Sequence, residues 1–313
     1  MAVRKEHARE WVDQGYPVGL VLKVLGVAHS SYYYISRDGK RGRRPSTQTV
    51  NKDGRCVNNT QILAEIEALL GQEFVDYGYL KVKHWLTKRK GYLINAKKVY
   101  RLMKEGELLY QPQSKRRSKR QWVKDLLPKT NQPFDYLELD FKTFYIGARK
   151  ALLLTVIDVH SRWVLGHLLA WKMSQKQVQI LFEQLLAVYP MPKKYTIRTD
   201  NGMQFEGLQI QHYLSEQKGL THEFCLPATP EQNAHIESYH SILERTVSSQ
   251  NFFSDLNDCQ QILNRFVQFY NYERIHSGVE YDCPYNFLKT LQIDMKKYNL
   301  TIPLDCKQFK ATC

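Results

Sequence analysis

The 313-residue sequence predicts an α/β protein: a mixed-sheet core in the second half, preceded by small all-helical segments of the helix-turn-helix kind that bind DNA. The first supporting observation is the order of patterns after residue 135, where three strand-like stretches precede helix, strand, helix, strand and helix. The second is charge. Residues 1–130 contain 27 Lys and Arg against 12 Asp and Glu, whereas residues 131–313 contain 18 against 19. Because the positive excess lies entirely in front, we expect the front half to bind a polyanion.

The composition excludes several other classes of protein. Hydrophobic residues make up 43% of the chain and charged residues 24%, as in ordinary globular proteins. No apolar run reaches the roughly 18 residues that a membrane helix needs, and charges occupy the N-terminal positions where a signal peptide has its apolar stretch. The six cysteines include no CxxC pair, which argues against a zinc ribbon or a redox motif. We therefore expect no membrane partner and a cytoplasmic or nucleoid-associated protein.

The first two segments are predicted to be a helix-turn-helix-like unit and a linker. Residues 1–36 contain short helical patterns separated by glycine turns, an order that is typical of helix-turn-helix units and equally compatible with a plain helical hairpin. Residues 37–58 are rich in Gly, Ser, Pro and Arg, and this composition predicts a basic linker.

Residues 59–110 are predicted to form a helical DNA-binding domain. Helical patterns cover Thr60–Leu70, Tyr79–Arg89 and Ala96–Glu105, and Asn95 is the expected N-cap of the third. This third helix has an apolar face and a basic remainder, which suits a DNA groove, although a solvated charged face would have the same pattern. The predicted DNA contacts on it are Lys97, Lys98, Arg101 and Lys104. A second basic linker, residues 111–130, is expected to contact phosphates through Lys115, Arg116, Arg117, Lys119 and Arg120.

Residues 131–290 are predicted to form the α/β core, and residues 291–313 a C-terminal tail. The predicted strands are Tyr136–Tyr145, Ala151–Val159, Arg162–Leu169, Tyr195–Thr199 and Thr221–Leu226. The predicted helices lie near Ser174–Tyr189, Glu206–Gln217, Glu231–Val247 and Asp255–Glu273.

Three acidic residues of this core are the candidates for chemistry. Asp140 lies inside a strand, where aspartate is disfavoured unless its charge is used, and Asp200 lies at the end of a strand, where ligands of α/β sheets bind. Glu237 lies on the helix after the last strand. Carboxylates from different elements can hold two Mg²⁺ ions, which stabilise the attacking and leaving oxygens of a phosphodiester. Taken singly, each acid is equally compatible with an exposed or capping role.

Several short motifs resemble, in order, those of one known family. The matching stretches are Val24-Leu25-Gly26-Val27, Ser30-Ser31-Tyr32-Tyr33, Tyr77-Gly78-Tyr79, Lys98–Met103, Leu139-Asp140-Phe141, Val156–Arg162, Thr199-Asp200-Asn201-Gly202, Pro230–Ser238 and Tyr270–Ser277. Together they extend from Val21 to Leu288 and resemble the insertion-sequence transposases that have a retroviral-integrase-like catalytic core, specifically those whose transposase follows a small upstream reading frame.

The resemblance implies a ribonuclease-H-like fold and a DDE triad of Asp140, Asp200 and Glu237 that holds two Mg²⁺ ions, with Mn²⁺ as a substitute. It implies strand cleavage at the ends of the element and attack of the 3′-OH on target DNA. It further implies a homo-oligomer on paired double-stranded ends in the bacterial nucleoid, and it leaves open a DNA-binding partner encoded by the upstream frame.

The sequence departs from the family at two points. Asp200 and Glu237 enclose 36 residues, one more than usual, so that Glu231 or Glu244 is an alternative third ligand. Glu244 occupies a position that is often basic, and its replacement by Lys is expected to be tolerated and to favour DNA binding by removing a negative charge near the phosphates.

The neighbours of the triad are expected to support it. Asn201 is expected to shape the loop behind Asp200, and Asn233 and His240 share the helix face of Glu237, where they would support the triad or contact DNA. The alternative function is that of a DNA-binding repressor or domesticated architectural protein with an inactive integrase-like core.

Overall fold

A computed structural model describes residues 2–34, 45–109, 128–226 and 229–297 of the chain. The chain forms two compact units that divide between Ser46 and Thr47. The first unit consists of α1 (Ala2–Asp13), α2 (Val18–Leu25) and α3 (His29–Tyr32) around the buried residues Ala8, Val21, Leu22 and Val27. Gly26 ends α2 in the left-handed region, with φ +61°, as the helix–turn–helix pattern requires.

The second unit begins with a β-hairpin, β1 (Gln48–Val50) and β2 (Cys56–Asn58), which corrects the prediction of a linker over the whole of residues 37–58. The turn is built by Asn51, whose side-chain oxygen accepts hydrogen bonds from the backbone N–H groups of Asp53 and Arg55. Gly54 completes it with φ +79°. Composition alone could not separate this turn from a flexible linker, because the same residue types favour both.

The three predicted helices of the front half are present as α4 (Asn59–Leu70), α5 (Tyr79–Lys88) and α6 (Ala96–Glu105). Asn95 caps α6 as predicted, accepting a hydrogen bond of 2.8 Å from the backbone N–H of Lys98. One apolar cluster joins the three helices, so their amphipathic faces meet as the sequence pattern indicates.

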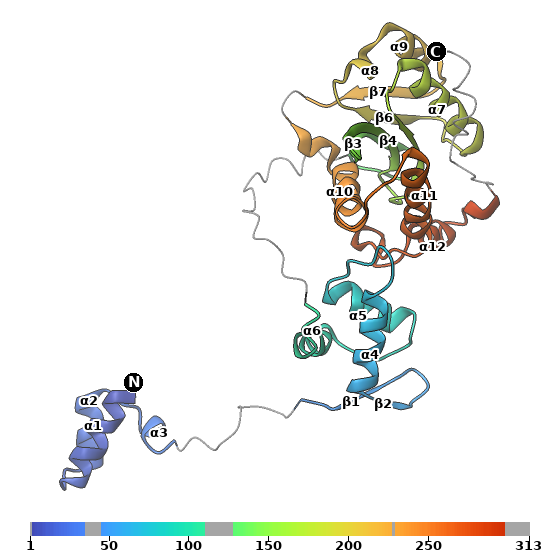
Figure 1. The fold of residues 1–313 in the computed structure, drawn as a ribbon. Helices are drawn as coiled ribbons and strands as arrows, with labels where there is room; N and C mark the ends of the chain where they lie inside the picture. The colour runs from blue at the N-terminus through green and yellow to red at the C-terminus, as the bar shows by residue number, and fades with distance from the viewer. Residues whose placement is uncertain (1, 35–44, 110–127, 227–228, 298–313) are drawn as a thin grey trace. The chain divides into compact units, whose positions relative to one another are not determined.

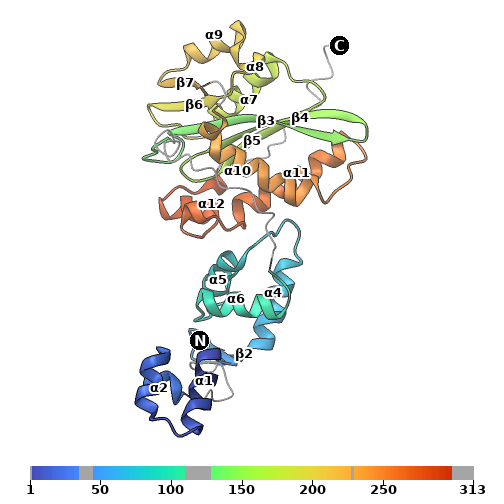
Figure 2. The same cartoon turned by 90° about the vertical axis from the view of Figure 1, so that its left-hand side faces the viewer.

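The core is a five-stranded mixed sheet in the order β5-β4-β3-β6-β7 (Figures 1 and 2). The strands are β3 (Tyr136–Ile146), β4 (Arg149–Asp158), β5 (Val164–Ala170), β6 (Tyr195–Thr199) and β7 (Leu220–Phe224). The first three pair antiparallel, whereas β6 and β7 run parallel to β3.

Helices cover both faces of this sheet (Figure 2). Helices α7 (Gln175–Val188), α8 (Met203–Glu206) and α9 (Leu208–Glu216) lie on one face, and α10 (Ala234–Leu243) and α11 (Leu256–Tyr272) on the other. The final helix, α12 (Pro284–Thr290), packs on α11. The predicted helix over Glu206–Gln217 is divided at Gly207, and the one over Glu231–Val247 ends in a π-helical turn at Glu244–Ser248.

Side-chain alternation along β3 separates the two layers. Leu137 and Leu139 pack with the α7 layer, whereas Phe144 packs with the α10–α11 layer. Because strand side chains alternate with a period of two, Glu138, Asp140 and Lys142 share the face of Phe144. The polar residues of β3 therefore lie towards α10.

We predict that Gly219→Ala destabilises the protein far more than Gly54→Ala. Both glycines have φ +79°, which costs a residue with a side chain about 1–2 kcal/mol. At Gly219 an added Cβ would lie 1.9 Å from the carbonyl oxygen of Lys193, whereas nothing lies within 4 Å at Gly54. Urea unfolding should show an additional loss of about 1–3 kcal/mol at Gly219, because the start of β7 must move. Equal losses of unfolding free energy in the two variants would show that the loop before β7 accommodates the added Cβ without cost.

Candidate active site

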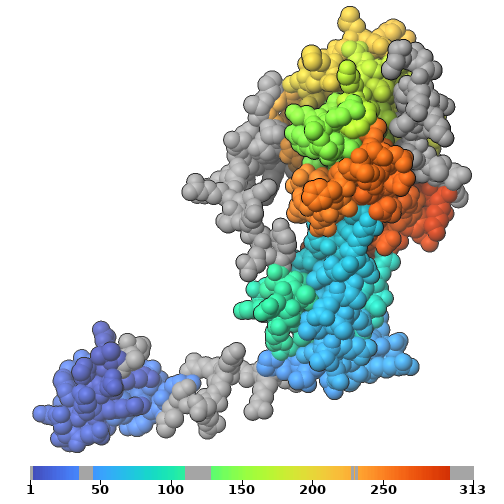
Figure 3. Space-filling view, viewed as in Figure 1, coloured from blue at the N-terminus to red at the C-terminus, as the bar shows by residue number. Residues whose placement is uncertain are grey.

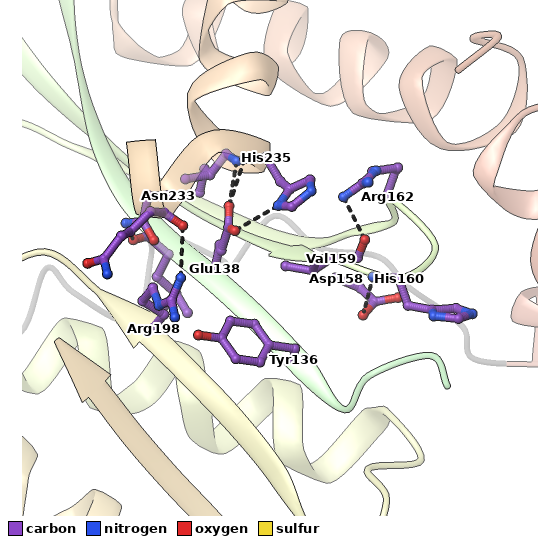
Figure 4. A network of polar contacts seen from close by, with 12 residues as sticks. Tyr136, Glu138, Asp158, Val159, His160, Arg162, Arg198, Asn233 and His235 are labelled. Atoms are coloured by element: carbon purple, nitrogen blue, oxygen red, sulfur yellow. Dashed lines mark hydrogen bonds and ion pairs between the residues drawn. The ribbon is translucent and has the colours of Figure 1, made fainter. Parts of the chain in front are cut away.

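A buried carboxylate attaches helix α10 to strand β3. Glu138 is completely buried, and its Oε2 accepts hydrogen bonds from the backbone N–H groups of His235 (3.0 Å) and Ile236 (2.9 Å) (Figure 4). Its Oε1 lies 2.8 Å from Nδ1 of His235. The negative charge thus meets free N–H groups at the positive end of the helix. Sequence reasoning missed this residue, although its position two residues before Asp140 on the same strand face was a usable signal.

The next residue on this face is Asp140, one of the predicted catalytic acids. Its Oδ2 lies 3.5 Å from Nδ1 of His240 on α10, and its Oδ1 accepts a hydrogen bond from the backbone N–H of Phe141. The Nε2 atom of His240 is buried without a hydrogen-bond partner. His240 therefore lies beside the candidate site, as its position on the helix indicated.

The third residue on this face, Lys142, explains the unexpected acid at position 244. Its Nζ lies 2.6 Å from Oε2 of Glu244, where α10 passes into the π-helical turn. The hydrogen bond from Lys142 is the main reason why the pKa of Glu244 is lowered. The expectation that Lys is tolerated at position 244 took no account of this partner. A lysine there would face Lys142.

The contacts of Glu138, Asp140 and Lys142 follow one geometric rule. Two residues of a strand advance by about 6.8 Å, and four residues of a helix by about 6 Å. Each step from Glu138 to Asp140 to Lys142 is thus matched by about one turn of the helix, from its first turn through His240 to Glu244. This match sets the height of α10 along β3.

Asp200 lies beside Asp140 because β6 runs parallel to β3. Glu138 is level with Arg198 in the pairing, so two residues further along Asp200 follows at the level of Asp140. Burial raises the pKa of Asp200, and the negative charge of Asp140 raises it further. The backbone N–H of Gly202 donates a hydrogen bond to Oδ1 of Asp200. The structure therefore brings two of the three predicted acids together.

Glu237, the third predicted acid, has an exposed side chain on α10. It lies three residues before His240, so the two share a helix face, and His240 is next to Asp140. Within the described residues, no three His, Cys, Asp or Glu side chains gather closely enough to hold a metal ion. The completed triad therefore stays a prediction.

Other polar residues hold the loops around these acids. Asn201 donates a hydrogen bond to the carbonyl of Cys225, and buried Asn233 donates one of 3.4 Å to the carbonyl of Leu139. Arg198, which sequence reasoning also missed, donates to the carbonyl of Gln232 (3.0 Å) and pairs with Glu223 (3.0 Å). These contacts attach the 3₁₀ turn before α10, Pro230–Asn233, to β6.

The predicted DNA contacts on α6 differ in their environment. Lys97 and Lys104 are exposed, whereas Lys98 and Arg101 are partly buried. Nζ of Lys98 donates a hydrogen bond of 2.6 Å to the carbonyl of Gln48, and Nε of Arg101 lies 3.8 Å from Glu105. Lys115, Arg116, Arg117, Lys119 and Arg120 lie outside the described residues.

We predict that Glu138→Gln lowers the free energy of unfolding by about 2 kcal/mol, since a buried acceptor of charge-assisted hydrogen bonds becomes neutral. Amide exchange at the start of α10 should accelerate, because the helix loses the group that holds its first turn. Glu216→Gln is the control, since that side chain is 61% exposed and its partner is a surface histidine. Unchanged stability and exchange in Glu138→Gln would show that neutral Gln fills the same role.

We predict that Glu244→Lys costs about 1 kcal/mol, because it removes a partly exposed ion pair and opposes two lysines. The exchanged pair, Lys142→Glu with Glu244→Lys, should recover at least half of this loss. A double-mutant cycle by urea unfolding measures the coupling, which should shrink at high salt. Zero coupling at low salt would contradict a stabilising pair.

The chain is similar to known proteins in both its core and its helical part. Residues 130–230 and 218–284 match integrase core domains, and residues 58–118 match an HTH-like domain. The transposase for insertion sequence element IS904 of Lactococcus lactis is 27% identical, over 79% of this chain and 98% of that protein. The insertion element IS407 uncharacterized 31.7 kDa protein of Burkholderia multivorans is 26% identical, over 77% of this chain and 86% of that protein.

Among solved structures, the catalytic core domain of BIV integrase is 18% identical, with a TM-score of 0.40, over 53% of this chain and 99% of that chain. The family matches confirm the predicted fold class, an integrase-type α/β core behind helical segments with an HTH-like domain. The chain thus has an integrase core domain behind an HTH-like domain, and it is similar to insertion-sequence transposases that have an integrase-like catalytic core.

Proposed function

We propose that this protein is a DDE transposase that cleaves DNA strands at the ends of its insertion element and transfers them into target DNA. The observation that carries the proposal is that Asp200 directly follows β6, the strand that runs parallel to β3 and its Asp140, in an integrase core. Glu138 holds the helix bearing Glu237 against the same strand. Such an arrangement suits phosphoryl transfer, where positioning and charge stabilisation dominate catalysis.

Asp140, Asp200 and Glu237 would hold two Mg²⁺ ions, with Mn²⁺ as a substitute. The pair of aspartates fits such a group, because burial and then the charge of Asp140 raise the pKa of Asp200, and carboxylates are the hard oxygen ligands that Mg²⁺ prefers. Glu237 would complete the site from α10. When bound, the ions would stabilise the charge on the attacking and leaving oxygens. The residues of the chain supply the negative donors and hold them at fixed heights on β3 and β6.

The front half would supply DNA binding. Exposed Lys97 and Lys104 are available to phosphates or base edges, and Lys98 and Arg101 would join them on α6. The five basic residues between Lys115 and Arg120 would contact the backbone. The substrates would be double-stranded transposon ends and target DNA, bound by a homo-oligomer in the nucleoid of a bacterial cytoplasm. An upstream-frame DNA-binding protein would be an additional partner.

The alternative function is that of a DNA-binding repressor with an inactive core, and the observation in its favour is that an acid, Glu244, occupies a position that is often basic. The pairing of Glu244 with Lys142 gives that acid a structural role and removes the reason to regard the core as inactive.

The described residues include no helix long and apolar enough to span a membrane.

We predict that Asp140→Asn, Asp200→Asn and Glu237→Gln each abolish Mg²⁺-dependent cleavage of end DNA while end binding survives. Each change keeps the shape of the side chain but removes an anionic oxygen that the metal needs. A gel assay of cleavage, with binding measured separately, checks both activities. Double replacements should lose no more than single ones, because the three groups act as a unit.

Glu231→Gln and Glu244→Gln are the matched controls, and both should keep cleavage within about tenfold of the wild type. An active Glu237→Gln enzyme beside an inactive Glu231→Gln or Glu244→Gln enzyme would reassign the third ligand. Full activity in Asp140→Asn or Asp200→Asn would contradict the proposed site.

A further inference from the structure

Two of the sequence motifs have no role in the site described above, yet they contact one another. Asp76 and Tyr77 lie between α4 and α5, and Arg274 and Ile275 follow α11. The Nη2 atom of Arg274 donates a hydrogen bond to Oδ1 of Asp76, and the backbone N–H of Ile275 donates one of 2.9 Å to the hydroxyl of Tyr77. The guanidinium of Arg274 is almost fully buried, with 1% of its side chain exposed. The helical domain and the core thus meet at a buried ion pair.

Around this ion pair, each of the two parts contributes an apolar side chain to the hydrophobic cluster of the other. Phe74, from the helical side, enters the core cluster with its ring 5.4 Å from that of Phe266, whereas Ile275 enters the cluster of α4–α6. The rings of His84 and Tyr281 stack at 3.9 Å. In Figure 3 the cyan surface of the helical domain lies directly against the orange surface of the core. Such interdigitation is typical of one packed body rather than two tethered domains.

The same contact reaches the helix that bears the candidate catalytic acid. Arg245, the residue after Glu244, donates a hydrogen bond of 2.9 Å to Oδ2 of Asp76. Burial would raise the pKa of Asp76, but the charge of Arg274, the hydrogen bond from Arg245 and the charge of Lys81 together outweigh burial and hold the pKa below its usual value. Asp76 is therefore an anion shared by the end of α11 and the π-helical turn after α10.

We propose that Asp76, Tyr77, Arg245, Arg274 and Ile275 form an interdomain clasp, which fixes helix α6 relative to Asp140 and so determines which phosphodiester is cut. The inference rests on the proposed function. Helix α6 packs on α5 within the helical domain, and the clasp attaches that domain to the core. When the clasp is formed, the distance between the DNA bound by α6 and the candidate catalytic acids is fixed. These five residues are positioning residues and make no contact with the reacting atoms.

The first test measures geometry without DNA. Spin labels are placed at Lys104→Cys on α6 and at Leu208→Cys on α9, both exposed, in a chain with Cys56, Cys306 and Cys313 changed to Ser. Pulsed electron resonance should give one narrow distance distribution for the clasped protein. Asp76→Asn should broaden it at least twofold. Identical widths would overturn the clasp, whatever the protein does to DNA.

The second test measures the position of cleavage on end DNA with Mg²⁺. Asp76→Asn should bind ends within about twofold of the wild type. It should spread cleavage over neighbouring phosphodiesters and cut the correct one about 10- to 100-fold more slowly, as small misplacements of reacting groups do. A variant that only loses stability would lower binding and cleavage together at one unchanged position. That result, or normal cleavage, would contradict the positioning role.

The matched control is Glu73→Gln with Arg265→Gln, a pair in the same contact region whose side chains are 54% and 55% exposed. This control should keep the narrow distance and the single cleavage position, because exposed pairs contribute little. If Asp76→Asn does not fold, Arg245→Gln replaces it, since Arg245 is 43% exposed and its loss should act in the same direction more weakly. Wild-type protein that binds ends without cutting them would refute the proposed function and leave the distance test intact.

Discussion

The carboxylate of Glu138 is the contact on which the arrangement of the core depends. It accepts two backbone hydrogen bonds at the start of α10 and contacts the ring of His235 in a site closed to water. A buried carboxylate is stabilised only where such donors surround it, so the strand and the helix stabilise one another. From this fixed point, the rise of strand and helix brings His240 to Asp140 and Glu244 to Lys142.

The parts of this structure that could be predicted are those that local patterns determine. Periodicity located the five core strands and the long helices, and the unusual setting of Asp140 and Asp200 singled them out. The parallel register that places the two side by side depends on β6 pairing with β3, across some sixty residues of sequence. The motif order indicated the family, but no spacing rule joins Asp76 to Arg274.

The other features that the sequence did not predict are likewise ones that local patterns leave undetermined. The hairpin at Gln48–Asn58 has the composition of a linker, because Asn, Asp and Gly serve tight turns and loose segments alike. Lys142 gave no signal as the partner of Glu244, since a strand lysine is ordinary on a solvated face. Some of the positive charge of the front half is likewise used within the protein: Lys88 pairs with Asp282, and Lys98 binds the carbonyl of Gln48. Net charge therefore overstates the number of cations that DNA can reach.

The π-helical turn at Glu244–Ser248 has a mechanical consequence. Its bond, from the N–H of Ser249 to the carbonyl of Glu244, spans one residue more than an α-helical bond. Two adjacent residues of this turn pair with different parts of the protein. Glu244 pairs with Lys142 on the central strand of the sheet, and Arg245 pairs with Asp76 of the helical domain. A displacement of the helical domain at Asp76 therefore acts on the sheet through the peptide unit between these two residues, in addition to the contacts of Arg274 and Ile275. This short turn thus connects the helical domain to the central strand directly, although many residues of chain separate the two in the sequence.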